Sequence, residues 1–176
     1  DYVFTPTAEE IYANNIQSVS FNFDGLEHQM EGKFRTGHFD GVGTIVKRLF
    51  EIVKPNKSYF GEKDFQQLQI IRKMVEKHQI PVKIIPCEIF RENDGLAMSS
   101  RNTRLTNEHR NAAPFIYKTL KQAKIEFGTK NALEVKQWVE NEFKKQPLLE
   151  LEYFEIAQEE TLLPIKNKIE SQKYRA

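Results

Sequence analysis

The sequence predicts an α/β fold that is followed by a smaller α+β unit. Apolar residues recur at helical spacing in two segments, and a short strand-like run follows each of them. The four segments are, in order, residues 40–53, 58–60, 64–77 and 82–85. This order, with short connections, is typical of right-handed crossover units and a parallel sheet. After Arg91 the pattern changes to a turn, a polar loop and further helices. We therefore expect a first domain at residues 1–97 and a second at 98–176.

The first domain contains further local patterns that predict its elements. An alternation of apolar and polar residues predicts a half-buried strand at 19–23, and the opening run 2–4 predicts a buried strand end. Asp40 is a favourable N-cap for the first long helix. The run 82–85 is continuously apolar, like a strand buried on both faces of a parallel sheet. Cys87 follows it and is expected to be a small buried hydrophobe.

The second domain is expected to combine helices with short strands. A helical pattern runs over residues 106–127 and ends before a glycine. Asn131 and Glu134 have the spacing of a capping box, which predicts the start of a further helix. Strands are expected at 149–153 and at 173–176.

The composition excludes several classes of protein. The chain has 26 basic and 25 acidic side chains, so its net charge of +1 provides no global positive field for nucleic acid. No apolar run approaches the roughly 20 residues that span a membrane, and the opening residues do not resemble a signal peptide. A single cysteine excludes an internal disulfide. We expect a cytoplasmic protein that binds neither nucleic acid nor a membrane.

The segment Gly61-Glu62-Lys63-Asp64 lies where a predicted strand meets a predicted helix. Ligands of open α/β sheets bind beyond the carboxyl ends of the strands, where helix N-termini present free N–H groups. Gly61 would let a ligand approach the backbone closely, Lys63 would bind phosphate, and Asp64 would accept hydrogen bonds from ribose hydroxyls. The same pattern also describes a glycine turn with a capped helix and solvated charges.

The segment Met98-Ser99-Ser100-Arg101-Asn102 is a second candidate for binding an anion. Adjacent hydroxyls supply directional donors, and a guanidinium can bind two phosphate oxygens together. Taken alone, the segment is more readily explained as a hydrophilic linker. If it faces the same crevice as Gly61–Asp64, the two segments together predict a site for a nucleotide polyphosphate.

Three other polar groups are weaker candidates. Either glutamine of the pair Gln66-Gln67 offers a donor and an acceptor to a small polar acid, and a solvated helix face is the alternative for Gln66. Arg35 and His38, in the glycine-punctuated segment 31–39, would bind a carboxylate or phosphate at a helix N-terminus, although surface turns explain the glycines equally well. The remaining histidines have no metal-site spacing, and we expect them to face solvent: His28, His78 and His109.

Three consecutive stretches resemble the motifs of pantothenate synthetases, in content and in spacing. They are Arg35-Thr36-Gly37-His38-Phe39-Asp40-Gly41-Val42, Tyr59-Phe60-Gly61-Glu62-Lys63-Asp64-Phe65-Gln66-Gln67-Leu68 and Asp94-Gly95-Leu96-Ala97-Met98-Ser99-Ser100-Arg101-Asn102. The opening residues 1–6 and the helix start at Leu105-Thr106 fit the family as well. The resemblance covers essentially the whole chain.

The resemblance implies a function and a fold. The family activates pantoate with ATP and Mg²⁺ and joins the acyl group to β-alanine, giving pantothenate, AMP and pyrophosphate. Its members are homodimers. The fold would be the second half of a Rossmann-like, nucleotidyltransferase-type α/β domain, followed by a small α+β C-terminal domain.

The resemblance also assigns roles to residues. The residues implied to bind ATP are Gly61, Glu62, Lys63, Asp64, Phe90, Met98, Ser99, Ser100 and Arg101. Among them, Lys63, Ser99, Ser100 and Arg101 would stabilise the reacting phosphates, and the backbone of Phe90 would lie against the adenine. Gln67 and Val42 would bind pantoate, and no side chain is implied to bind a resident metal.

The chain departs from the family in two respects. Thr36 stands where proline is usual, which removes no functional group. The resemblance also implies that the family's first third and last strand are absent, so we expect this chain alone to be inactive. Two other readings remain: a non-catalytic nucleotide- or RNA-binding module, and a structural piece that forms dimers.

Overall fold

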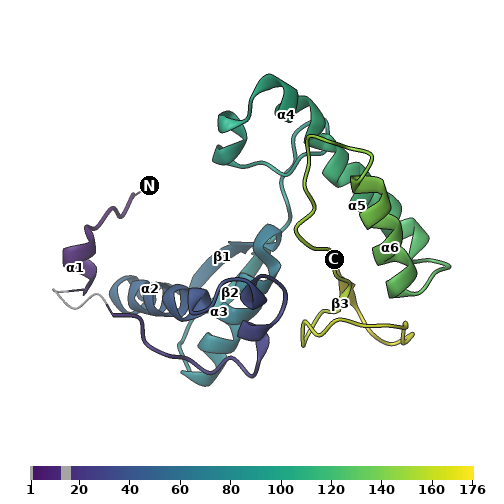
Figure 1. Cartoon of the computed structure of the whole chain (residues 1–176). Helices are drawn as coiled ribbons and strands as arrows, with labels where there is room; N and C mark the ends of the chain where they lie inside the picture. Colours follow the sequence, from purple (N-terminus) through teal and green to yellow (C-terminus); the bar gives the residue numbers. More distant parts are fainter. Residues whose placement is uncertain (1, 13–16) are drawn as a thin grey trace. The chain divides into compact units, whose positions relative to one another are not determined.

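The computed structural model describes residues 2–12 and 17–176, which divide into two compact units, Asp1–Cys87 and Glu88–Ala176 (Figure 1). The divide falls before the expected position between residues 97 and 98. The reason is that residues 91–97 form a hairpin within the second unit: Arg91 bridges Ala97, and the Arg91 guanidinium lies 3.7 Å from the centre of the Tyr117 ring. Asp1, in the opening motif, lies outside the described residues.

The first unit contains a parallel pair of strands joined by a helical crossover. Strands β1 (Lys57–Gly61) and β2 (Lys83–Cys87) pair in register from Lys57↔Lys83 to Gly61↔Cys87. Helix α3 (Phe65–Lys77) connects them, and α2 (His38–Val53) packs beside α3 (Figure 1). A short α1 (Ala8–Tyr12) and the 3-10 helices η1 (Leu26–His28), η2 (Met30–Lys33) and η3 (Glu62–Asp64) complete the unit. The predicted helices and the two predicted strands 58–60 and 82–85 are confirmed.

The core of this unit forms around the apolar stripe of α3. Leu68, Ile70, Ile71 and Met74 are at most 1% exposed. Phe50 of α2 contacts Phe60 of β1 edge to face, with ring centres 6.4 Å apart. A stripe at the helical period therefore holds α3 to its neighbours, as the sequence pattern predicts.

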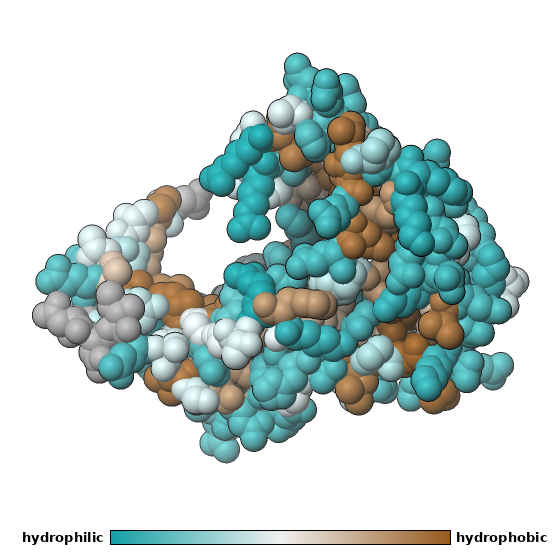
Figure 2. All heavy atoms as spheres, in the orientation of Figure 1, coloured by the Kyte–Doolittle hydropathy of each residue, from teal (hydrophilic) through white to brown (hydrophobic). Residues whose placement is uncertain are grey.

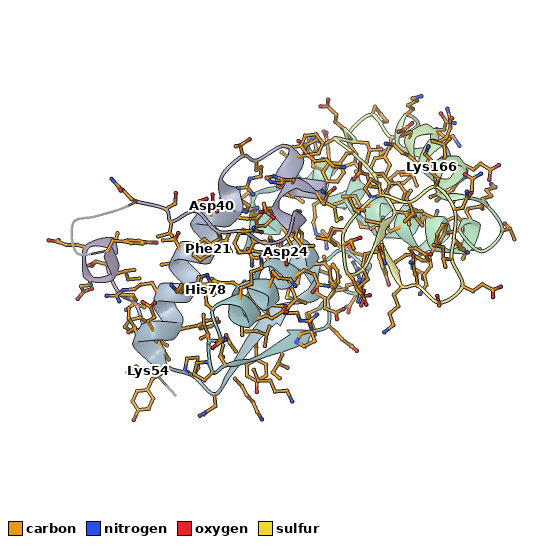
Figure 3. The ribbon with its side chains drawn as sticks, turned by 90° about the horizontal axis from the view of Figure 1, so that it is seen from below. Phe21, Asp24, Asp40, Lys54, His78 and Lys166 are labelled. Carbon is orange, nitrogen blue, oxygen red and sulfur yellow. The ribbon has the colours of Figure 1, made fainter. Side chains whose placement is uncertain are left out.

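The expected strand at 19–23 does not form, because side chains of α2 bind its backbone. The Phe21 N–H donates to Oδ1 of Asp40 over 2.9 Å (both labelled in Figure 3), and the Val19 N–H donates to Oγ1 of Thr44 over 2.8 Å. The Phe21 and Phe23 rings pack against Gly43, where an added Cβ would lie 3.0 Å from the Phe21 ring. Because Asp40 binds Phe21, it does not cap α2, whose N-cap residue is Gly37.

Three further expectations for the first unit are wrong. Residues 2–4 form no strand, and Tyr2 and Val3 are fully or almost fully exposed. β2 is only half buried, because β1 is its single partner among the described strands. Cys87 is likewise partly exposed.

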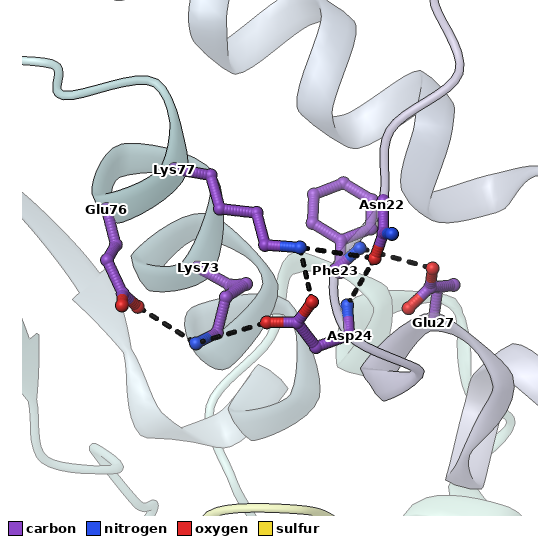
Figure 4. A network of polar contacts seen from close by, with 7 residues as sticks. All are labelled: Asn22, Phe23, Asp24, Glu27, Lys73, Glu76 and Lys77. Carbon is purple, nitrogen blue, oxygen red and sulfur yellow. Dashed lines mark hydrogen bonds and ion pairs between the residues drawn. The ribbon is translucent and has the colours of Figure 1, made fainter.

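An exposed network of charges fastens the turn at residues 22–24 to α3 (Figure 4). Lys77 binds the Asp24 carboxylate and Oδ1 of Asn22, and the Lys73 ammonium lies 3.5 Å from the other carboxylate oxygen of Asp24. Asp24 has a φ of +60°, a conformation that aspartate tolerates better than most residues. The hydrogen bond from Lys77 lowers the pKa of Asp24.

The second unit is built from helices and one short antiparallel pair. Its elements are η4 (Ser100–Arg104), α4 (Asn107–Ala112), α5 (Pro114–Glu126), α6 (Ala132–Phe143), β3 (Ala157–Gln158) and β4 (Tyr174–Arg175). The helix expected over 106–127 is divided in two, because Pro114 has no N–H for a continuous helix. The capping box of Asn131 and Glu134 is confirmed.

The core of the second unit lies between α6 and the extended segment before β3. Val135 and Val139 are 0% exposed and belong to one apolar cluster with Phe154 and Ile156. No strand forms at 149–153, whereas the expected strand at the C-terminal end is present as β4. The core therefore depends on side-chain packing more than on a sheet.

The surface carries apolar side chains among hydrophilic ones (Figure 2). Val53 and Tyr59 of the first unit are 55% and 65% exposed, and Phe90 of the second unit is 72% exposed. Within residues 2–12 and 17–176, no helix combines the length and the apolar character needed to cross a bilayer.

We expect Gly95→Ala to destabilise the protein and Gly41→Ala to stabilise it slightly. Gly95 has a φ of +91°, and an added Cβ would lie 2.3 Å from Cδ1 of Tyr117, so alanine should cost about 2 kcal/mol or more. Gly41 is helical with no atom within 4 Å of an added Cβ, so alanine should add about 0.5–1 kcal/mol. Urea unfolding measures both, and equal effects of the two substitutions would contradict this account.

Candidate functional site

The glycine turn at Gly61–Asp64 lies at the carboxyl end of β1. Gly61 is the last residue of the strand and pairs with Cys87, η3 follows directly, and α3 begins at Phe65. The first N–H groups of a helix have no partner within the helix and attract anions. The turn therefore brings a helix N-terminus to the edge of the sheet.

Neither the backbone nor the packing requires glycine at position 61. Its φ of −70° and ψ of 135° are ordinary for any residue. The nearest atom to an added Cβ is the backbone nitrogen of Lys63, 4.0 Å away. The space above Gly61 is open, as a ligand lying against the backbone would require.

Two charged groups of this turn, those of Lys63 and Asp64, have no structural role that the described residues reveal. Lys63 and Asp64 are both exposed, and neither pairs with any residue in the described ranges. Asp64 occupies the N-cap position of α3, yet its side chain accepts no capping hydrogen bond. Both side chains are therefore available to a ligand.

The two glutamines at the start of α3 differ sharply in environment. Gln67 is half-buried, whereas Gln66 is only 6% exposed. The alternative of a solvated helix face for Gln66 is wrong. Gln66 lies one turn before the buried Ile70, and this spacing is the signal in the sequence that could have placed it inside.

The segment that leads into α2 forms a cavity of about 340 Å³ within the first unit. It is lined by Ser20, Phe21, Glu27, His28, Gly32, Arg35, Thr36, Gly37, Phe39 and Asp40. Arg35 is bound to Glu31, with Nη1 3.3 Å from Oε1. Val42, in the first turns of α2, is half-buried. The remaining histidines are exposed, as the sequence predicts: His28, His78 and His109.

In the second unit, a hairpin carries Phe90 and Met98. The Met98 N–H donates to the Phe90 carbonyl over 2.9 Å, next to the bridge between Arg91 and Ala97. The side chains of Phe90 and Met98 are 72% and 51% exposed. Two large apolar side chains thus project from a short, hydrogen-bonded hairpin.

The Ser99–Arg101 segment is the start of η4 and is not an irregular linker. Ser99 is the N-cap, and its Oγ accepts from the Arg101 N–H over 3.2 Å. The Ser99 hydroxyl proton remains able to donate. Ser100 and Arg101 are exposed, and Arg101 forms no ion pair with the residues that the structure describes.

A polar network that the sequence did not predict holds this segment in place. Nδ2 of Asn102 donates to Oε1 of Glu92 over 3.2 Å and to the Ala97 carbonyl over 3.1 Å. Arg110 lies 2.5 Å from Oδ2 of Asp94 and 3.6 Å from Oε2 of Glu92. The hydrogen bond from Arg110 lowers the pKa of Asp94. The hairpin and the start of η4 are therefore fixed to α4.

The predicted site residues fall into two groups, one in each unit. Those of the first unit are Val42, Gly61, Glu62, Lys63, Asp64 and Gln67. Those of the second unit are Phe90, Met98, Ser99, Ser100 and Arg101. Within each unit the structure brings the consecutive residues of a motif onto one turn or hairpin.

The carboxylates of the candidate site do not by themselves form a metal centre within the described residues. Among the described residues, no group of three or more His, Cys, Asp and Glu side chains could hold a metal ion. Mg²⁺ is commonly bound by substrate phosphates and waters with one or two carboxylates. The Asp64 carboxylate is exposed and is not used by the helix, so it is open to a ligand.

Comparison with known proteins identifies the class and then the family. A protein from Thermus thermophilus, solved as pantoate-beta-alanine (pantothenate synthetase), superposes with a TM-score of 0.89 at 37% identity, over 99% of this chain and 63% of that one. The fold is thus the α/β fold of Rossmann-like nucleotidyltransferases. The family model for pantoate-beta-alanine ligase matches residues 1–176. The chain belongs to the pantoate-beta-alanine ligase family.

Other relatives support the same family assignment. The pantothenate synthetase of Flavobacterium psychrophilum is 59% identical over 174 residues, covering 99% of this chain and 62% of the relative. That of Bacteroides fragilis is 47% identical over 166 residues, covering 94% and 58%. A pantoate-beta-alanine ligase from Francisella tularensis, solved as a complex with beta-gamma ATP and beta-alanine, has a TM-score of 0.63 at 36% identity, over 76% of this chain and 50% of that one. The chain spans about three fifths of the length of the two curated relatives and half of the Francisella tularensis chain.

We expect His38 to titrate below the usual range for histidine. Partial burial lowers its pKa, and the positive charge of Arg35 lowers it further. The folded state therefore binds the His38 proton less well than the unfolded chain does. The neutral His38 ring contributes to the free energy of unfolding above about pH 6.5, and this contribution is lost as the pH falls through the lowered pKa.

An NMR titration of the His38 ring tests this expectation. Arg35→Ala should raise the His38 pKa, and Lys54→Ala serves as a control in the same unit. A His38 pKa that is unchanged by Arg35→Ala would show that the charge of Arg35 has no influence.

Proposed function

We propose that this chain supplies the ATP- and pantoate-binding part of a pantoate–β-alanine ligase. The observation that carries the proposal is the turn after β1, where Gly61 leaves open space and the exposed Lys63 pairs with no described residue. The family match and the ATP and β-alanine named for the Francisella tularensis relative support it.

We assign the binding of ATP to the turn Gly61–Asp64 and to the η4 segment. Lys63 and Arg101 bind phosphate oxygens, and Asp64 binds the ribose. Further donors or contacts come from Gly61, Glu62, Phe90, Met98, Ser99 and Ser100. Mg²⁺ bound to the triphosphate offsets part of its charge. In each unit, an exposed cation stands next to backbone N–H groups at a helix start.

The reaction follows from the charges. A pantoate carboxylate oxygen attacks the α-phosphorus of ATP, the bond to the β-phosphate breaks, and pyrophosphate leaves with the bonding electrons. Lys63, Arg101 and the serine hydroxyls stabilise the charge on the leaving group. The amine of β-alanine then attacks the carbonyl of the acyl-adenylate, loses a proton, and AMP leaves. No side-chain nucleophile is required.

For pantoate, we assign Gln67 and Val42. The amide of Gln67 supplies a donor and an acceptor for hydroxyl and carboxylate groups, and Val42 supplies an apolar wall. Both side chains are half-buried in the first unit. The substrate amine β-alanine has no assigned residue.

The test is AMP release by a protein of the relatives' full length that contains this sequence. We expect release that requires ATP, pantoate and β-alanine together. Release without β-alanine would argue against the ligase, and preferential binding of short RNA over ATP would favour the binding-module alternative. We expect the 176-residue chain alone to show no steady-state turnover.

We also propose a cytoplasmic homodimer for the full-length enzyme. Support comes from the family and from the single cysteine, which suits a reducing compartment. Light scattering gives the mass in solution, and a monomer at working concentration would contradict the dimer.

We expect Lys63→Ala and Arg101→Ala each to lower kcat by about a hundred-fold or more, because each removes a charge that stabilises the transition state. Lys57→Ala and Arg104→Ala are the controls, since Lys57 is an exposed residue of the strand that leads to Lys63, and Arg104 is an exposed residue of the helix that contains Arg101. Initial rates of AMP release measure the effect. Equal losses in the variants and their controls would remove Lys63 and Arg101 from the site.

We expect Gly61→Ala to weaken ATP binding while leaving the fold intact. The backbone at Gly61 tolerates alanine and the Cβ meets no close neighbour, so the free energy of unfolding should stay the same or rise slightly. A methyl group in the open space should obstruct a ligand that lies on the backbone. Calorimetric titration with ATP and urea unfolding separate the two effects, and unchanged ATP affinity would contradict the close approach.

A further inference from the structure

Within the described part of the chain, Gln66 is the only polar residue of α3 that is buried. It is 6% exposed, whereas Lys63 and Asp64 just before it are exposed and Gln67 after it is half-buried. Glutamine is seldom buried without a polar partner. The hydrogen bonds of the Gln66 side chain therefore explain why it lies inside the fold.

Both amide hydrogens of Gln66 bind the segment that contains η1 and η2. Nε2 donates to the carbonyl of Leu26 over 2.8 Å and to the carbonyl of Gln29 over 2.6 Å. Because both partners are carbonyl acceptors, the orientation of the amide is determined. We call this pair of hydrogen bonds the Gln66 anchor.

The remaining oxygen of the amide has no partner. Oε1 of Gln66 is buried and accepts no hydrogen bond in the described part of the chain. An unpaired buried acceptor costs free energy, which an apolar side chain of similar size would avoid. Burial alone therefore does not account for a glutamine at this position.

Gly32 shows how closely the segment approaches the amide. A Cβ at Gly32 would lie 3.2 Å from Nε2 of Gln66, and its closer contact, 2.0 Å, would be with the Glu27 carbonyl oxygen of the same segment. Gly32 also lines the cavity that precedes α2. The segment is therefore tightly folded on itself where it contacts the first turn of α3.

We propose that Gln66 is a positioning residue that acts through Gln67. Consecutive side chains of a helix point about 100° apart, so fixing Gln66 on one side sets the direction of Gln67. Small displacements of a substrate-binding group cost large factors in rate. The inference rests on the proposed function, in which Gln67 binds pantoate.

The experiment uses an enzyme of the relatives' full length that contains this sequence. Gln66→Met and Gln66→Leu each remove the two hydrogen bonds and leave an apolar side chain of similar size. We expect both to lower kcat/KM for pantoate by about ten- to a hundred-fold while KM for ATP stays unchanged.

Ile71→Val is the matched control, because Ile71 is 0% exposed on the same helix but takes no part in the anchor. It should lower the urea midpoint without changing KM for pantoate. If the two anchor variants behave like Ile71→Val, or if they raise KM for both substrates alike, the anchor is structural only. AMP release by the wild-type enzyme is measured before any variant. If that release does not depend on pantoate, the proposed function is overturned as well.

Discussion

The parallel pairing of β1 with β2 determines where the candidate site lies. Two parallel neighbours cannot be joined by a tight turn, so the chain must cross back along a helix. That helix, α3, therefore begins just beyond the carboxyl end of β1, at the Gly61–Asp64 turn. The position of a helix N-terminus and an exposed lysine at the sheet edge follows from this topology. The apolar stripe of α3, centred on Leu68 and Ile71, holds the arrangement together.

Features that depend on residues close in sequence could be predicted. The helical period identified α2 and α3, and the capping box at Asn131 and Glu134 was visible as a four-residue pattern. The turn at Gly61–Asp64 followed from the change of period between a strand and a helix. These elements are specified by local hydrogen bonds and by one apolar face, which a single sequence displays directly.

Features that depend on distant partners could not be predicted. The alternating pattern at 19–23 resembles a strand, but its N–H groups bind Asp40 and Thr44 on a helix. The helical spacing could have placed Gln66 inside, but it does not reveal the partners of Gln66, which are carbonyls of a segment some 40 positions earlier. The sequence pattern assigned residues 91–97 to the first domain, yet the stacking of Arg91 on a tyrosine makes this hairpin part of the second unit. In each case a long-range contact outweighs the local pattern.

The pairing of charges separates cations that hold the fold from cations that can bind a ligand. Lys73, Lys77 and Arg110 each bind a carboxylate and fix a turn or a hairpin to a helix. To bind a phosphate, each would first have to leave its partner, which would release the segment that it holds. Lys63 and Arg101 pair with no described residue, so binding a phosphate disrupts no contact of the described chain. In the second unit, Arg110 and Asn102 hold the backbone next to Arg101 in place, so part of the ordering that anion binding requires is already present there.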